Sequence, residues 1–178
     1  MARTKDDVLV KMFEHLDHAK KILHEEGYLQ PTVFAHTPLH ESLLVLPIVN
    51  EDSDLPEVAL DVVSRIVCAY NVTDYFVVSE SYHMTADGKM QDECVNVIYV
   101  GARDRKLISS PFRRLSNGDL FFGETVEIVP SNIEGSVLDL FKLKERLPRL
   151  SETDKAHIRL LFPAQTDDEI AASSQTLH

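Results

Sequence analysis

The stretch YFVVSESYHM, residues 75–84, opens the part of the chain that decides the fold. Three further strand-like runs follow it, over residues 94–100, 106–113 and 120–129. Turn-forming residues separate these runs, and the Asn117-Gly118 pair is a strong signal of a hairpin. Consecutive strands with short connections pair antiparallel, so this segment predicts an antiparallel sheet.

Helical patterns lie on the N-terminal side of this segment. Apolar residues recur at helical spacing, Phe13 among them, and predict a helix over Thr4–Gly27. Two short strands, Thr32–His36 and Ser42–Ile48, are expected next. Leu55–Tyr70 then has a wide apolar face of β-branched residues, which are weak helix formers. This helix is therefore expected to pack on the sheet, with Val62 and Ile66 among its most buried residues.

The complete pattern predicts an α+β fold. Its antiparallel sheet has about five or six strands, with an N-terminal helix, a central helix packed on the sheet and C-terminal helices. The C-terminal helices are expected over Gly135–Lys144 and from Ser151 to about Phe162. We expect a single α+β domain over residues 1–165 and a mobile C-terminal tail over 166–178, because that tail is polar and lacks large anchoring side chains.

Charge and composition narrow the partners. The 178 residues include 18 Lys and Arg against 29 Asp and Glu, which gives a formal net charge of −11. Such a chain repels phosphate backbones, so no direct nucleic-acid binding is expected. No apolar run is long enough for a membrane span, and none near the N-terminus indicates a signal peptide. Cys68 and Cys94 show no CxxC spacing, which favours a reduced, cytoplasmic protein.

Histidine pairs are weak candidates for chemistry. His15 and His18 lie three apart on a predicted helix, but no further ligand motif completes a metal site. His36 and His40 lie four apart with Pro38 between them, which argues against a helix that would align their rings. Neither HExxH nor a glycine-rich cofactor loop occurs, so no metal and no cofactor are expected.

Glu80 is the most informative single residue. Side chains alternate along a strand, so Glu80 shares a face with Phe76, Val78 and other large side chains. A carboxylate buried there needs a cation, for which Arg65, Arg103 and Arg113 are candidates. Glu80 is interpreted either as a general acid or base, with His83 or His36 as the accompanying histidine, or as half of a structural ion pair.

Positive charge concentrates beside the predicted hairpins of this acidic chain. These residues could hold an anion or an acidic partner, or they could form a solvated face that offsets the acidic loop near residue 52. The run lacks the interleaved aromatic residues on which bases stack. The residues concerned are Arg103, Arg105, Lys106, Arg113 and Arg114.

The motif aromatic-x-x-Ser-Glu-x-aromatic around Glu80 is followed by a polar hairpin and an apolar strand. This arrangement resembles a group of small uncharacterised bacterial and bacteriophage proteins, in which Trp is expected where this chain has Tyr82. The resemblance covers residues 74–114, about a quarter of the chain. It implies a bacteriophage or bacterial host context, with the host cytoplasm as the location, and no particular activity.

Three functions remain open. The first is a non-enzymatic interaction or accessory protein that acts through a surface. The second is a small enzyme with a site around Glu80 and a histidine, which requires those groups to meet in one pocket. The third is an acidic inhibitor of a nucleic-acid enzyme.

Self-association is expected because many apolar residues lie outside the predicted core faces. Large exposed apolar patches mark interfaces, and two-fold dimers are the commonest symmetric assembly. We therefore expect a homo-oligomer, with a dimer favoured, or another protein on the same surface. The residues are Phe112, Leu115, Phe121, Phe122, Leu138, Leu140, Phe141, Leu143, Leu160, Leu161 and Phe162.

Overall fold

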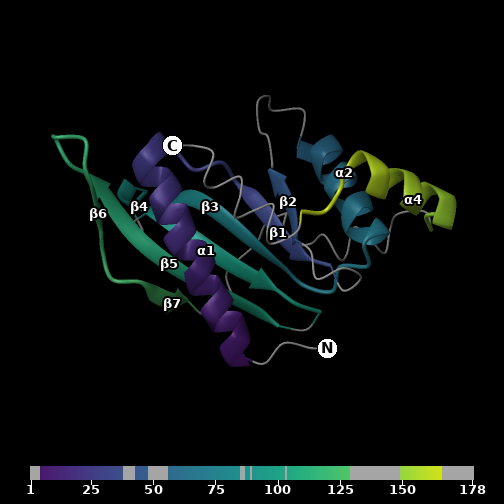
Figure 1. Cartoon of the computed structure of the whole chain (residues 1–178). Coiled ribbons are helices and arrows are strands. Elements are labelled where there is room, and N and C mark those ends of the chain that lie inside the picture. Colours follow the sequence, from purple (N-terminus) through teal and green to yellow (C-terminus); the bar gives the residue numbers. More distant parts are fainter. Residues whose placement is uncertain are drawn as a thin grey trace. The chain divides into compact units, whose positions relative to one another are not determined.

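The computed structural model describes residues 5–37, 43–47, 56–84, 87–88, 90–102, 104–128 and 149–165 (Figure 1). The chain divides into two compact units. Unit 1 comprises Met1–Thr32 and Phe76–Ile133, and unit 2 comprises Val33–Tyr75 and Glu134–His178. The predicted helix Gly135–Lys144 and the predicted tail 166–178 lie outside the described residues. The single domain expected over residues 1–165 stays a prediction.

The fold is α+β, as the sequence predicted. It has an N-terminal helix, an antiparallel sheet of six to seven strands and further helices. The helices of the described part are α1 (Lys5–Glu26), α2 (Pro56–Ala69) and α4 (Glu152–Leu161). Within the described residues, no helix has both the length and the apolar character that a membrane crossing requires.

Unit 1 holds α1 and most of the sheet. Its strands follow the order β3-β4-β5-β6, and β7 also pairs with β5. Antiparallel β4 and β5 pair from Glu93 opposite Phe112 to Val100 opposite Arg105, with Val97 opposite Ile108 near the middle of the pair. The bounds are β3 (Tyr75–Met84), β4 (Met90–Val100), β5 (Arg105–Arg114), β6 (Leu120–Phe122) and β7 (Val126–Ile128).

α1 packs on one face of this part of the sheet and contacts β4 (Figure 1). Its buried stripe recurs every three or four residues, which is the spacing that keeps one helical face on the core. Phe13 was expected on this stripe but is exposed, because the buried stripe is narrower than the apolar pattern. The helix ends at Gly27, whose φ of 81° and N–H donation to the Leu23 carbonyl form a left-handed cap. The buried residues are Val8, Met12, Leu16, Ala19 and Leu23.

The strand predicted over 120–129 is divided into β6 and β7. β6 pairs with the end of β5, and β7 pairs with its first half. Ser109 lies opposite Val126, whereas Phe112 lies opposite Phe122. Two residues of β5 therefore face three residues between β6 and β7, which is the arrangement of a β-bulge. The predicted Asn-Gly hairpin joins β5 to β6, and Gly118 has a φ of 89°.

Unit 2 contains β1 (Thr32–His36, whose first residue belongs to unit 1), β2 (Leu43–Pro47), α2 and α4. Ile66 on α2 is buried, as predicted, but Val62 is exposed. The prediction for Val62 was wrong because the apolar face of this helix is wider than the face that is covered. α2 lies against α4 within the unit (Figure 1). Packing of α2 on the sheet stays a prediction.

Hydrogen bonds fasten α4 to the end of α2. Nε of Arg159 donates to the Ala69 carbonyl at 2.7 Å, and Nη2 donates to the same oxygen. The Tyr70 hydroxyl donates to the Phe162 carbonyl at 2.6 Å and accepts from the Ala164 N–H at 3.1 Å. These bonds satisfy carbonyls at two helix ends, which a helix cannot satisfy by itself.

Candidate functional site

The basic residues singled out in the sequence lie at two separate places on β5. Arg105 and Lys106 begin the strand, and Arg113 and Arg114 end it. At about 3.3 Å per residue the two pairs are about 25 Å apart. Arg103 lies outside the described residues. The two pairs therefore belong to different ends of the sheet.

Glu80 lies on β3 and is mostly buried, with 18% of its side chain exposed. One carboxylate oxygen accepts from Nη2 of Arg114 at 3.0 Å, and the other accepts from the Leu29 backbone N–H at 3.1 Å. The prediction of a buried carboxylate paired with an arginine is confirmed. The contact with Leu29 shows that Glu80 faces the chain leaving α1, whereas the sequence considered the helix 55–70 for this face.

Arg114 joins three parts of unit 1. Besides Glu80, its guanidinium donates to the Gly27 carbonyl at 2.8 Å and to the Glu93 carboxylate at 3.3 Å. The same guanidinium lies 5.4 Å from the centre of the Phe112 ring. We call Glu80, Arg114 and these partners the Glu80 clamp. It fixes the C-terminal end of α1 to β3, β4 and β5.

The arginine that pairs with Glu80 in the structure is Arg114, which was not among the partners proposed from the sequence. Neighbouring residues on a strand point to opposite faces, so Arg113 and Arg114 diverge. Arg113 donates to Asp92 at 3.0 Å, whereas Arg114 donates to Glu80. The choice between them depends on the register of β5 with its neighbours, which the sequence does not state.

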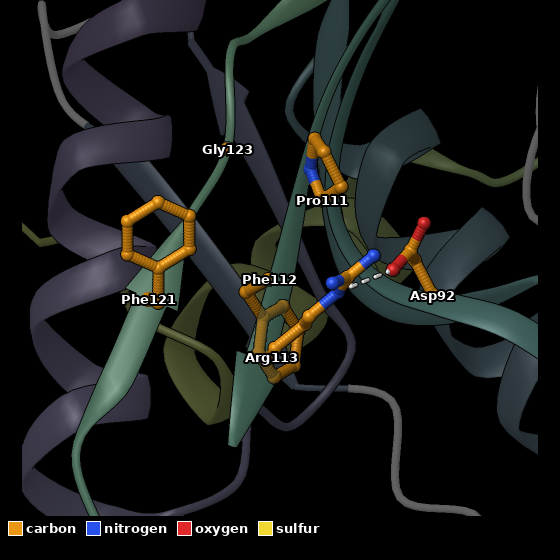
Figure 2. Close-up of a pocket in the computed structure, with 6 residues that line it drawn as sticks. All are labelled: Asp92, Pro111, Phe112, Arg113, Phe121 and Gly123. Atoms are coloured by element: carbon orange, nitrogen blue, oxygen red, sulfur yellow. Dashed lines mark hydrogen bonds and ion pairs between the residues drawn. The ribbon is translucent and has the colours of Figure 1, made fainter. Parts of the chain in front are cut away.

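A shallow cavity lies beside the Arg113–Asp92 pair, and we call it the Phe121 cavity. Its volume is about 250 Å³. Figure 2 shows the Phe121 ring on one side and Pro111 with the Arg113–Asp92 ion pair on the other. Phe121 is 62% exposed, although it is a large apolar residue. The lining residues are Asp92, Pro111, Phe112, Arg113, Phe121 and Gly123.

The bulge explains why this cavity exists. The Gly123 N–H donates to the Pro111 carbonyl at 2.7 Å, and Pro111 has no N–H to return a bond. A Cβ atom at Gly123 would lie 3.0 Å from Cγ of Pro111, so any other residue there would require Pro111 to shift by a few tenths of an ångström. Proline and glycine within strands are known signals of a bulge. Each of the two residues is a bulge signal in the sequence, but their pairing across strands, which forms the cavity, is not.

A lysine lies over an aromatic ring on the face of the sheet that α1 covers. The Lys20 ammonium lies 5.2 Å from the centre of the Phe122 ring. Burial lowers the pKa of Lys20, and the nearby Asp17 charge opposes that change. Lys20 therefore extends across an aromatic surface of the sheet, where a cation–π contact is favourable.

The candidate histidines lie on different elements of the fold. His36 lies on β1 in unit 2, and its side chain is half-buried. His83 lies on β3. His15 on α1 packs 4.8 Å from the Phe76 ring, and His18 is exposed. Among the described residues, no three His, Cys, Asp or Glu side chains gather as a metal site.

Comparison with known proteins finds no matching family model, no matching curated protein and no matching solved structure. The resemblance over residues 74–114 stays a prediction. The site must therefore be interpreted from its own chemistry. That chemistry comprises the Glu80 clamp, whose charged groups are paired, and the neighbouring Phe121 cavity, whose aromatic ring is exposed.

Proposed function

We propose that the protein is a non-enzymatic interaction or accessory protein, and that its partner binds the outer edge of β6 and β7. We call this surface the β6–β7 edge. The observation that carries the proposal is the exposed Phe121 ring beside a strand edge with which no described strand pairs. A bacteriophage origin and a cytoplasmic location remain proposals from the sequence.

Backbone hydrogen bonds identify which groups of β6 face outward. The Leu115 N–H donates to the Asp119 carbonyl at 2.9 Å, and the Gly123 N–H donates to the Pro111 carbonyl. Asp119 and Gly123 therefore direct their backbone groups toward β5. Antiparallel strands alternate in this respect, so Phe121 between them does the same.

Leu120 and Phe122 consequently direct their N–H and C=O groups away from β5. An extended segment of another protein can pair with these groups as an additional strand. Phe121 and Val126 are both exposed, and their partners Arg113 and Ser109 lie on the same face of β5. The added segment would therefore place alternate side chains next to Phe121 and Val126. Backbone pairing supplies affinity, and the Phe121 cavity supplies a position for one apolar side chain.

Charge favours a basic segment as the partner. Glu124 and Glu127 lie on the β6–β7 edge, are exposed and form no ion pair within the described part of the chain. Charged residues also protect strand edges from indiscriminate pairing. A partner with lysines or arginines at the matching positions would compensate these charges, whereas an acidic or uncharged one would not.

Fluorescence anisotropy with a labelled peptide of alternating lysine and valine tests the proposal. We expect binding that weakens in high salt, and weaker binding of a glutamate–valine peptide. Leu120→Pro removes an outward N–H without removing a bond to β5, so it should abolish binding. Phe121→Ser should weaken binding, and Val10→Ser, an exposed change on α1, is the matched control.

Unchanged melting temperatures would show that these variants fold. Equal binding of both peptides, or full binding by folded Leu120→Pro, would contradict the proposal.

A second candidate is the predicted homodimer, through the end of α4. Leu160 is 79% exposed, and its neighbours Leu161 and Phe162 are also exposed. We propose that a second copy covers these side chains by two-fold symmetry. Sedimentation equilibrium should show a dimer that Leu160→Ser weakens. A monomeric mass at high concentration would contradict the dimer.

The enzyme alternative has less support than these two. Both oxygens of Glu80 are held by Arg114 and the Leu29 N–H, so the carboxylate has a structural role available. The acidic-inhibitor alternative draws only on the net charge and on exposed carboxylates such as Glu124. Both remain alternatives from the sequence.

A further inference from the structure

Unit 2 contains a cavity of about 440 Å³ that the proposed partner surface does not use. It lies between α2, the two residues before the Ser151 cap of α4, and the first turns of α4. We call it the α2–α4 cavity. Its volume falls in the range of small-molecule sites. The lining residues are Arg65, Arg149, Leu150, Asp154, His157 and Ile158.

The cavity presents hydrogen-bond donors that the folded chain does not use. Arg65 donates through Nε to Asp61 at 2.8 Å, and its two terminal nitrogens make no other hydrogen bond in the described part of the chain. Arg149 forms no ion pair or hydrogen bond with any described residue. His157 adds a ring that has an N–H donor even when neutral.

The acidic groups near the cavity are engaged in part. One oxygen of Asp154 accepts from the Ser151 N–H at 3.1 Å and from the Ser151 hydroxyl at 2.6 Å, which closes the capping box of α4. Asp61 is paired with Arg65. These bonds engage Asp61 and one oxygen of Asp154, and the second oxygen of Asp154 accepts no hydrogen bond from the described residues. The terminal guanidinium donors of Arg65 and those of Arg149 remain available to a ligand.

We propose that the α2–α4 cavity binds a small phosphate monoester. A guanidinium presents a planar pair of donors that matches two oxygens of a phosphate, and two arginines can hold one phosphate group together. Leu150 and Ile158 supply an apolar wall for the carbon skeleton of the ester. The site is independent of the β6–β7 edge, so either can fail without the other.

Calorimetric titration with glycerol 2-phosphate tests the site, with inorganic phosphate and glycerol as comparison ligands. We expect the monoester to bind more tightly than inorganic phosphate, and glycerol not to bind. Arg149→Gln should weaken monoester binding about tenfold, since a charged hydrogen bond is lost. Lys21→Gln, which removes an exposed cation of α1 in unit 1, is the control and should leave binding unchanged.

NMR spectra of the His157 ring protons locate the ligand, because they should shift on addition of the monoester in the wild-type chain. Arg149 precedes α4 and makes no contact with described side chains through its charge, so Arg149→Gln should fold. Equal affinity for phosphate and monoester would overturn the assignment to an ester. Unweakened binding by Arg149→Gln, or unmoved His157 signals at saturation, would overturn the site.

Discussion

The Glu80 clamp makes a quantitative prediction about the stability of unit 1. Glu80→Gln removes the charge but keeps an oxygen that can accept from the Leu29 N–H. The pair is partly shielded from water, with 18% of the Glu80 side chain and 40% of the Arg114 side chain exposed. Unit charges about 4 Å apart attract by about 4 kcal/mol at an effective dielectric constant of 20, and desolvation offsets much of that.

The expected coupling energy follows from these limits. Exposed ion pairs contribute about 0.2–1 kcal/mol, and breaking a fully buried pair costs about 3–5 kcal/mol. Glu80 and Arg114 lie between these cases, so we expect about 1–2 kcal/mol. Glu80→Ala should cost a further amount of about 1–3 kcal/mol, because the Leu29 N–H then loses its acceptor.

A double-mutant cycle in urea measures the coupling directly. The cycle uses Glu80→Gln, Arg114→Gln and the double variant, so the bonds of Arg114 to other groups cancel. The control cycle joins Asp92→Asn with Arg113→Gln, a pair of the same 3.0 Å length in which the Arg113 side chain is 73% exposed. We expect less than about 1 kcal/mol for the control, falling further in high salt.

Zero coupling between Glu80 and Arg114 would refute the clamp. So would equal coupling in the two cycles with equal loss in salt, since the lower exposure of Arg114, 40% against 73% for Arg113, would then have no effect. An activity found later that folded Glu80→Gln lacks would instead favour the enzyme alternative.

Three further predictions concern unit 2. Ile66→Ala should lower the free energy of unfolding by about 2–5 kcal/mol in urea, and the exposed Val62→Ala by under about 0.5 kcal/mol; similar losses would contradict the packing of α2. Hydrogen bonds from Ser151 lower the pKa of Asp154. The stability that these bonds add to the fold should be fully present above the pKa that Asp154 has in the unfolded chain, and it should be lost as pH falls through the pKa of Asp154 in the folded chain. Thermal melting across acidic pH should show this loss, and Asp154→Asn should abolish it. Tyr70→Phe removes the hydroxyl that joins the end of α2 to the chain after α4, and should speed amide hydrogen exchange after α4 while leaving exchange in unit 1 unchanged.

Much of the fold could be predicted because local periodicity determines it. β1 and β3 have the predicted bounds, and Gly27 ends α1 as the capping pattern indicated. The predicted strand 120–129 was divided because the bulge depends on Pro111, a residue of another strand. Val62 was misplaced for a related reason: an apolar helical face shows what could be buried, not how much of it is covered.

The candidate site was predictable only in part. Alternation along β3 identified Glu80 as a carboxylate among apolar neighbours, and burial then required a cation. Choosing Arg114 over Arg113 requires the register of β5, because a shift of one residue would exchange the faces on which the two side chains lie. The α2–α4 cavity could not be predicted, because Arg65 and Arg149 are distant in sequence and become neighbours only when α4 packs on α2.

The exposed apolar groups also indicate which contact a partner must rely on. Full burial of Phe121 and Val126 would contribute about 1.5–3 kcal/mol each. Association costs about 4–15 kcal/mol in lost translational and rotational freedom, so these two side chains alone leave little or no net affinity. The outward backbone groups of Leu120 and Phe122 must then supply much of the affinity. Leu120→Pro should therefore weaken binding more than Phe121→Ser does, and the reverse order would favour a partner that binds the aromatic ring without extending the sheet.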